Sequence, residues 1–326
     1  TSFRRPSNTL ALADSPPATF RATLEPISGR YHLYASLACP WAHRVLVARS
    51  LLGLEKHLGV TIVDWKLGDD GWAFFEPQHS PVEARYLRDV YVAADPGYSG
   101  RVTVPVIWDL EKKTIVNNES REVLRQLAVK LGPGLNPGCY DLSPQDLRPA
   151  IDQAIDKIYA VNNGVYQTGF AKTQNAYDEA IEILFSGLDF WDDHLDRNAF
   201  VVGDRLTEAD ICMFTTLIRF DPVYVVHFKC SRRRIADYPN LSHYLRSLYQ
   251  IPAIRRTVDF EHIRHHYYCS HTTINPFGIV ADCFCGDLDT PHNRWQRFPQ
   301  GLDQSKRKES ASSAAIATQL SQLLEA

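Results

Sequence analysis

The sequence predicts a protein of two domains, an α/β domain followed by an all-α domain. Residues 30–131 alternate between short β-branched or aromatic runs and helical patterns, whereas residues 145–280 carry helical spacing almost throughout. A stretch rich in Gly, Pro and Asn, residues 132–144, separates the two patterns as a linker. The chain has 326 residues, 44% of them hydrophobic, which is enough to bury two cores.

A β–α–β unit opens the first domain. The aromatic run YHLYAS at 31–36 predicts a strand, and a helix is expected from the turn at Cys39 to a stop near Gly53. The β-branched run GVTIVDWKL at 59–67 predicts the second strand. Strand, helix and strand within so short a stretch indicate that the two strands are parallel.

A long excursion, a hairpin and a helix complete the first domain. Residues 68–103 are polar and aromatic and too long for an ordinary connection, so we expect a functional loop there. VPVIWD at 104–109 and KTIVNN at 113–118 predict two strands, and residues 119–131 predict a closing helix. The predicted order is β-α-β, excursion, β-β-α.

The second domain is predicted to be all-α because buried faces recur at helical spacing. Thr207 and Asp210 have the spacing of a helix N-cap, with Asp in place of the usual Glu or Gln. We expect an extension at 1–29 and a tail at 281–326 that is poorly ordered from about Gly286, where a Ser/Ala-rich stretch could form a loose helix. The predicted helical segments are 144–170, 174–195, 207–228 and 240–251.

Composition excludes several classes of function. A net charge of −3 and a pI near 6.4 provide no general attraction to nucleic acid or to anionic membranes. No apolar run reaches the ~20 residues that span a bilayer, and the N-terminus is too polar for a secretory signal. The chain begins at Thr1 rather than Met, which leaves an upstream leader open. We therefore expect no nucleic-acid and no membrane partner.

Seven cysteines, an odd number scattered along the chain, do not form the dense framework of a small secreted protein. They indicate a reducing compartment, which we take to be the cytoplasm. Free cysteine often behaves as a small buried hydrophobe. On that ground four cysteines are expected to be structural thiols: Cys139, Cys212, Cys230 and Cys269.

Cys39 has a different setting, because it stands where a strand gives way to a helix. A helix N-terminus and nearby cations lower the pKa of a thiol, Pro40 suits the first helical turn, and Arg44 follows one turn later. We expect an acidic nucleophile; the alternative is an inert buried cysteine. Ala42 occupies the position of the second cysteine of a dithiol oxidoreductase. An external thiol must then release any mixed disulfide, and in a cytoplasm that thiol is glutathione.

Two further motifs offer contacts for a tripeptide such as glutathione. Val104-Pro105 at the start of a strand predicts a cis-proline loop whose backbone could pair with an extended peptide, the alternative being a plain edge strand. Glu119-Ser120 opens a helix, where amides and a hydroxyl suit a carboxylate and Glu119 suits an ammonium group. The alternative is that Asn118 or Ser120 only caps this helix.

Together these motifs resemble glutathione transferases of the Xi class, the glutathionyl-hydroquinone reductases. The matching stretches within residues 30–280 include CPWAHR, GWAF, YLRDVYVAADPGYSGRVTVPVIWD, TIVNNES, NNGVYQTGFA and HIRHHYYCSHTTINPFGIV. The resemblance implies a thioredoxin-like N-terminal domain, an all-α C-terminal domain and a homodimer. It also implies the reaction, in which a glutathionyl-hydroquinone and the co-substrate glutathione give a hydroquinone and glutathione disulfide.

The resemblance also implies the residues of the site. The catalytic set comprises the nucleophile Cys39, the proton donor Tyr166, and two tyrosines that stabilise the thiolate, Tyr224 and Tyr267, with Tyr268 as the alternative to Tyr267. The glutathione contacts are Trp72, Arg101, Val104, Glu119 and Ser120. Aromatic walls such as Trp72, Phe74 and Tyr166 could hold a flat hydroquinone ring. Without the resemblance, each tyrosine is typical of an amphipathic core position.

Three other clusters of side chains favour structural roles, and no metal is expected. Two thiols and one histidine in the tail fall short of a tetrahedral zinc site: Cys283, Cys285 and His292. Four histidines near one helical face lack a carboxylate or thiol to complete a metal site: His262, His265, His266 and His271. The run Arg232–Arg234 is expected in a solvated loop, with contact to an anionic partner as the alternative.

We therefore expect a glutathione-dependent reductase of glutathionyl-hydroquinones with a side activity on small mixed disulfides. One alternative is a broader cysteine-type thioltransferase or dehydroascorbate reductase. Another is a non-catalytic carrier of aromatic ligands, which the pair Cys39 and Tyr166 disfavours because a carrier needs neither. The physiological quinone stays open.

Overall fold

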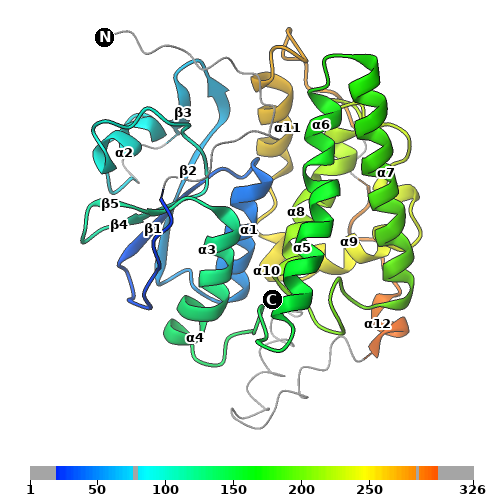
Figure 1. The fold of residues 1–326 in the computed structure, drawn as a ribbon, viewed down its shortest axis with the longest axis horizontal. Coiled ribbons are helices and arrows are strands. Elements are labelled where there is room, and N and C mark those ends of the chain that lie inside the picture. The colour runs from blue at the N-terminus through cyan, green and yellow to red at the C-terminus, as the bar shows by residue number, and fades with distance from the viewer. Residues whose placement is uncertain (1–19, 76–79, 284–285, 300–326) are drawn as a thin grey trace.

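Helix α1 (Pro40–Leu51) lies between a sheet on one side and a bundle of helices on the other (Figure 1). The computed structural model describes residues 20–75, 80–283 and 286–299. Within them, no helix is both long enough and apolar enough to cross a membrane.

Five strands form one sheet in the order β3-β2-β1-β4-β5. β1 pairs with β2 in parallel, as predicted, and every other pair is antiparallel. The strands are β1 (Tyr31–Ala35), β2 (Leu58–Gly68), β3 (Gly71–Phe74), β4 (Val106–Asp109) and β5 (Thr114–Asn117). A parallel β–α–β unit followed by a β-hairpin and α3 (Ser120–Gln126) is the thioredoxin-like arrangement that we expected.

The excursion at 68–103 is not an unbroken loop, and that prediction is wrong. It holds β3 and α2 (Leu87–Ala94). β3 has only four residues and pairs with β2 across a tight turn. So short a strand is stabilised by pairing and burial rather than by its own residue pattern, which is why the sequence did not reveal it.

The second domain is all-α, as predicted. Its helices are α5 (Arg148–Asn162), α6 (Gly164–Gly169), α7 (Gln174–Arg197), α8 (Glu208–Arg219), α9 (Leu241–Tyr249), α10 (Pro252–Arg255), α11 (Phe260–Ser270) and α12 (Arg294–Arg297), with a π-turn (Phe220–Tyr224) after α8 and a 3₁₀ turn (Ile235–Asp237) before α9. Every residue of α8 is buried, because α1, α5 and α9 pack around it. Thr207 and Asp210 form the predicted capping box at its start.

α11 and the first part of the tail depart from the prediction. α11 lies outside the four predicted helical segments and packs against β2. Arg294 of α12 is 1% exposed and donates to the carbonyl oxygens of Leu195, Asn198 and Ala199. Poor order was therefore wrong for residues 286–299, because the buried Arg294 and the ion pair between Asp289 and Arg255 anchor them. The Ser/Ala-rich stretch lies outside the described residues.

A row of ion pairs joins the two domains near α3. Arg121 contacts Asp152 and Asp156 of α5, at 3.2 and 2.7 Å. Arg125 contacts Asp152 and the fully buried Glu208 of α8. Together with the packing of α1 on α8, these pairs fix the first domain against the second.

Candidate active site

Cys39 lies where β1 ends and α1 begins, at the boundary between the domains. It is the N-cap residue of α1, with an extended backbone (φ −74°, ψ 119°), and Pro40 occupies the first turn. The Cys39 side chain is half-buried. The predicted strand–turn–helix setting of Cys39 is confirmed.

The loop before β4 lies against Cys39. The Val104–Pro105 peptide bond is cis, as predicted, and the Cys39 Sγ lies 3.9 Å from the carbonyl oxygen of Val104. Arg101 is half-buried on the same loop, where its carbonyl oxygen accepts a hydrogen bond of 2.6 Å from the Tyr98 hydroxyl. Cys39 and the cis-proline loop therefore form one site.

Burial raises the pKa of the Cys39 thiol above its ordinary value. The backbone amides of Ala42 and Trp41 and the guanidinium groups of Arg219 and Arg44 act in the opposite direction. The effect of burial is larger, so the prediction of an acidic thiol is wrong for this conformation. The sequence revealed the helix start and Arg44 but not how deeply the sulfur is enclosed.

Three tyrosines of the helical domain bring their hydroxyl groups together in what we call the hydroxyl cluster: Tyr166 of α6, Tyr224 of the π-turn and Tyr267 of α11. The Tyr267 hydroxyl lies 2.6 Å from that of Tyr166 and 3.0 Å from that of Tyr224. All three side chains are buried. The Tyr268 hydroxyl instead lies 3.0 Å from the Cys283 Sγ, so Tyr267 and not Tyr268 belongs to the cluster.

The hydroxyl cluster is neutral and lies within electrostatic reach of Cys39. Burial raises the pKa of Tyr166 and Tyr267 well above the ordinary value and that of Tyr224 to about 12. A negative charge on Cys39 raises the pKa of Tyr166 and Tyr224 further. These hydroxyls therefore keep their protons at neutral pH and can donate them.

Trp72 of β3 connects the sheet to α11. Its ring stacks on His266 with centroids 5.0 Å apart and planes at 22°. His266 is held in turn by Trp65, since its Nδ1 lies 2.7 Å from the Trp65 carbonyl oxygen and donates to it. Phe74, proposed with Trp72 as an aromatic wall, packs against Tyr34 in the sheet domain, at 5.5 Å between centroids.

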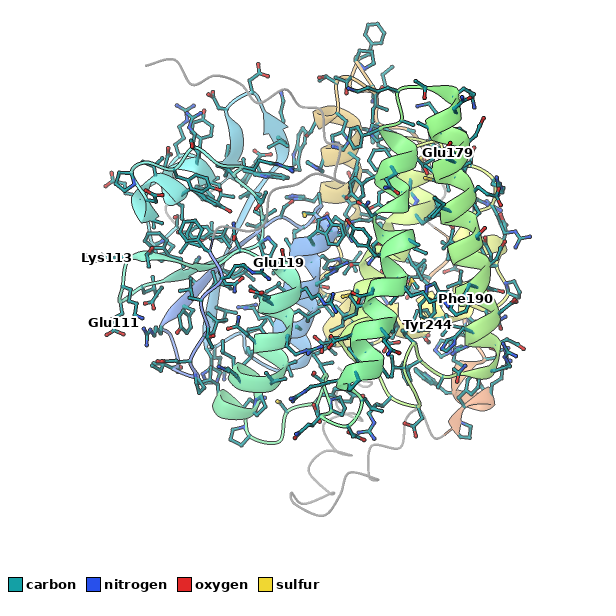
Figure 2. All side chains as sticks on the ribbon, in the orientation of Figure 1. Glu111, Lys113, Glu119, Glu179, Phe190 and Tyr244 are labelled. Atoms are coloured by element: carbon teal, nitrogen blue, oxygen red, sulfur yellow. The ribbon has the colours of Figure 1, made fainter. Side chains whose placement is uncertain are left out.

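Glu119 lies at the start of α3, between the sheet and the helical domain (Figure 2), and Ser120 is the first residue of that helix. Glu119 is itself the N-cap residue, and its carboxylate accepts a hydrogen bond of 3.2 Å from the backbone amide of Arg121. Ser120 is buried, at 6% exposure. The alternative named Asn118 or Ser120 as the cap of this helix, and neither residue occupies the N-cap position. Glu119 combines a capping role with a carboxylate that is half-buried.

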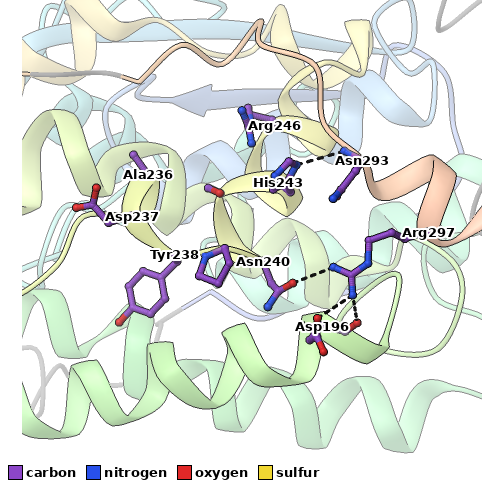
Figure 3. A pocket seen from close by; sticks show the side chains of 11 residues that line it. Asp196, Ala236, Asp237, Tyr238, Asn240, His243, Arg246, Asn293 and Arg297 are labelled. Atoms are coloured by element: carbon purple, nitrogen blue, oxygen red, sulfur yellow. Dashed lines mark hydrogen bonds and ion pairs between the residues drawn. The ribbon is translucent and has the colours of Figure 1, made fainter.

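A separate cavity of about 590 Å³ opens on another face of the helical domain. Polar side chains line it, with Arg297 bound to Asp196 and Asn240 and the Asn293 backbone amide donating to His243 (Figure 3). None of the predicted site residues lies in this cavity.

The other clusters form ordinary contacts. The Nδ1 atom of His271 lies 3.1 Å from the Nε2 atom of His227. In the part of the chain that the structure describes, no three or more His, Cys, Asp or Glu side chains come together as a metal site; Cys285 lies outside that part. Arg232 and Arg234 pair with Glu182 and Asp237.

Sequence reasoning missed two buried residues that hold the Cys39 turn, His43 of α1 and Arg219 of α8. Both are 0% exposed. His43 directly follows the Cys-Pro-Trp-Ala motif, and Arg219 lies at the end of a helix that is otherwise largely apolar. The signal available in the sequence was Arg219 itself, a charged residue at the end of a helix that is otherwise largely apolar.

The two domains match two family models. The N-terminal domain of glutathione S-transferases matches residues 38–129, and their C-terminal domain matches residues 174–247. Glutathionyl-hydroquinone reductase YqjG of Escherichia coli is 48% identical over 275 residues, which cover 82% of this chain and 84% of that protein. The chain therefore belongs to the glutathione S-transferase family.

Solved structures narrow the relationship to one class within the family. An Xi-class glutathione transferase from Natrialba magadii has a TM-score of 0.82 and 46% identity, over 85% of this chain and 91% of the other. The glutathione-bound structure of Escherichia coli YqjG has a TM-score of 0.82 and 45% identity, over 86% and 97%. The resemblance to the Xi class, the glutathionyl-hydroquinone reductases, and the predicted fold class are confirmed.

Proposed function

We propose that this chain reduces glutathionyl-hydroquinones to hydroquinones, with glutathione as the reductant. The observation that carries the proposal is the Cys39 thiol at the start of α1, 3.9 Å from the Val104 carbonyl oxygen of the cis-proline loop and within electrostatic reach of the neutral hydroxyl cluster. The name of the relative YqjG supports this substrate class, and the glutathione in its structure supports the co-substrate. A reducing compartment rich in glutathione, such as the cytoplasm, is where this chemistry operates.

In the first step the Cys39 thiolate attacks the sulfur that joins glutathione to the ring carbon. The carbon–sulfur bond breaks with its electron pair left on carbon, and the Tyr166 hydroxyl supplies the proton that this carbon requires. The products are the hydroquinone and a mixed disulfide between Cys39 and glutathione. Tyr267, whose hydroxyl lies 2.6 Å away, can return a proton to Tyr166.

In the second step a free glutathione thiolate attacks the glutathione sulfur of the mixed disulfide. Glutathione disulfide leaves and the Cys39 thiolate is restored. Two glutathione sulfurs are thereby oxidised while the ring carbon is reduced. Ala42 in place of a second cysteine supports this route, because the protein has no adjacent thiol that could close an internal disulfide.

Glutathione would lie along the cis-proline loop, with its backbone against Val104 and its charged ends toward side chains that cross the site. The glutamyl end carries an ammonium group for the Glu119 carboxylate and a carboxylate for the start of α3 at Ser120. Arg101 and Trp72 are the contacts proposed for the rest of the tripeptide.

The first test is the substitution Cys39→Ser, assayed by chromatography of hydroquinone release from a glutathionyl-hydroquinone in the presence of glutathione. We expect a loss of about 10³-fold or more, because a hydroxyl cannot form the mixed disulfide. Cys269→Ser is the matched control, since Cys269 is also half-buried and its Sγ lies 3.4 Å from the Gly278 carbonyl oxygen, away from the cis-proline loop. Release by Cys39→Ser at the wild-type rate would falsify the assignment of the nucleophile.

A further inference from the structure

Arg219 of α8 is wholly buried, and its guanidinium reaches from the helical domain to the turn that ends at Cys39. Nε donates to the carbonyl oxygen of Ala38 at 2.7 Å, and Nη2 donates to that of Leu37 at 2.8 Å. Leu37 and Ala38 directly precede Cys39. One planar group therefore fixes the turn that presents the thiol.

The remaining contacts of Arg219 are also to uncharged groups. Nη1 donates to the carbonyl oxygen of Thr215 at 2.6 Å and to Nδ1 of His43 at 3.0 Å. Because a guanidinium only donates, Nδ1 of His43 accepts and the ring carries its proton on Nε2, 2.8 Å from the Thr257 hydroxyl. Burial and the charge of Arg219 hold the pKa of His43 well below its ordinary value, so His43 stays neutral.

Among the described residues Arg219 forms no ion pair, although Arg121 and Arg125 at the same domain boundary are both paired with carboxylates. A buried charge without a partner of opposite sign costs several kcal/mol. Four neutral acceptors satisfy the hydrogen bonds of Arg219 but not its charge. An anion beside the Leu37–Ala38 turn would balance that charge.

Cys39 is the group beside this turn that can become an anion. Arg219 from α8 and Arg44 from α1 both favour the thiolate, Arg219 the more strongly, whereas Tyr166 and Tyr224, within electrostatic reach of Cys39, carry no charge. The Arg44 guanidinium lies over the Trp41 ring, 4.2 Å from its centroid. Arg219 is thus the stronger of the two cations that oppose the effect of burial.

We propose that Arg219 is the positioning residue of the nucleophile: it holds the Cys39 turn through Leu37 and Ala38 and is the fixed counter-charge of the Cys39 thiolate. This inference rests on the proposed function only for the choice of Cys39 as nucleophile. It concerns the ionisation of Cys39, which can be measured without any hydroquinone.

The test compares Arg219→Met, which removes the charge at similar length, with Arg219→Lys, which keeps it. The readout is the rate at which iodoacetamide alkylates Cys39 between pH 6 and 10, followed by mass spectrometry of the Cys39 peptide. We expect Arg219→Met to slow alkylation at pH 7.5 about tenfold or more and to move the profile up by about one pH unit. Arg219→Lys keeps the charge but cannot make both hydrogen bonds of the planar group, so we expect it to move the profile by less than about half a pH unit.

Arg294→Met is the matched control, because Arg294 is equally buried and also clamps backbone carbonyls, but at α7. We expect it to lower stability and leave the Cys39 profile unchanged. A folded Arg219→Met with the wild-type profile overturns the inference, as does an Arg219→Lys profile displaced by about a pH unit. Should Arg219→Met not fold, Arg219→Lys decides: a wild-type profile supports the counter-charge.

The outcome is separable from that of the proposed function. A displaced profile in Arg219→Met upholds the inference even if the wild-type protein releases no hydroquinone. An unchanged profile overturns it even if the reductase activity is found.

Discussion

Burial is the main influence on the protonation state of single residues in this site. The Tyr166 hydroxyl keeps its proton because its side chain is buried among other neutral hydroxyls, and in the proposed mechanism that proton goes to the ring carbon. The same burial disfavours ionisation of the Cys39 thiol, which depends on nearby amides and cations to lose its proton. Burial thus favours the protonated form of both groups, which suits the proposed acid Tyr166 and disfavours ionisation of the proposed nucleophile Cys39.

Tyr166→Phe should separate the two chemistries that Cys39 could perform. We expect release of hydroquinone to slow about 10²-fold, since only this step puts a proton on carbon, while reduction of a simple glutathione mixed disulfide changes less than about threefold. Tyr268→Phe is the control, because its hydroxyl lies outside the hydroxyl cluster. Equal losses in both assays would favour the broader thioltransferase instead.

At the scale of elements, the site depends on how α3, α5 and α8 are held together. Glu208 is fully buried at the start of α8, and Arg125 of α3 is its ion-pair partner. Burial raises the pKa of Glu208 above its ordinary value, and the charge of Arg125 offsets only part of that rise. Since α8 also carries Arg219, this ion pair helps to hold Arg219 in register with the Cys39 turn.

Arg125→Met should destabilise the protein by about 3 kcal/mol at neutral pH, because it leaves the Glu208 carboxylate buried and unpaired. The folded-state pKa of Glu208 then rises further above its unfolded value, so the deficit grows as pH increases and shrinks as pH falls and Glu208 binds a proton. Urea unfolding at pH 5 and pH 8 measures this difference.

Arg21→Met is the control for that substitution, because it breaks an ion pair with Glu122 in which Arg21 is 52% exposed. We expect a much smaller loss of stability than for Arg125→Met, with little dependence on pH in this range, because solvent screens the exposed pair. A deficit of Arg125→Met that is the same at both pH values would show that Glu208 is not the group involved.

At the scale of the whole molecule, the site exists only where the two domains meet. Cys39 and Val104 come from the sheet domain, and the hydroxyl cluster and Arg219 come from the helical domain (Figure 1). Neither domain alone would hold both the nucleophile and the acid. The packing of α1 on α8 and of α11 on β2 brings them together.

We also predict that the chain assembles as a homodimer, as the resemblance implies. Phe277 and Ile279 are 87% and 69% exposed after α11, and large exposed apolar side chains favour association. Sedimentation equilibrium should give twice the chain mass of 37.0 kDa at micromolar concentration. A single mass of 37.0 kDa over that range would rule the homodimer out.

The sequence was most informative where structure is local. The helix start at Cys39, the cis-proline at Pro105 and the capping box at Thr207 each depend on a few adjacent residues, and all three were predicted. β3 and the anchoring of α12 by Arg294 were not, because each is stabilised by partners distant in the chain.

By itself the sequence determined the two-domain order of elements, the family resemblance and the choice of Cys39 as the candidate nucleophile, since these lie in contiguous motifs. Only the tertiary structure decided which tyrosine of the 267–268 pair joins the hydroxyl cluster, which cation supports Cys39 and how far burial opposes its ionisation. The reason is physical: pKa values and hydrogen-bond partners depend on distances and solvent exclusion between segments that are far apart in the chain.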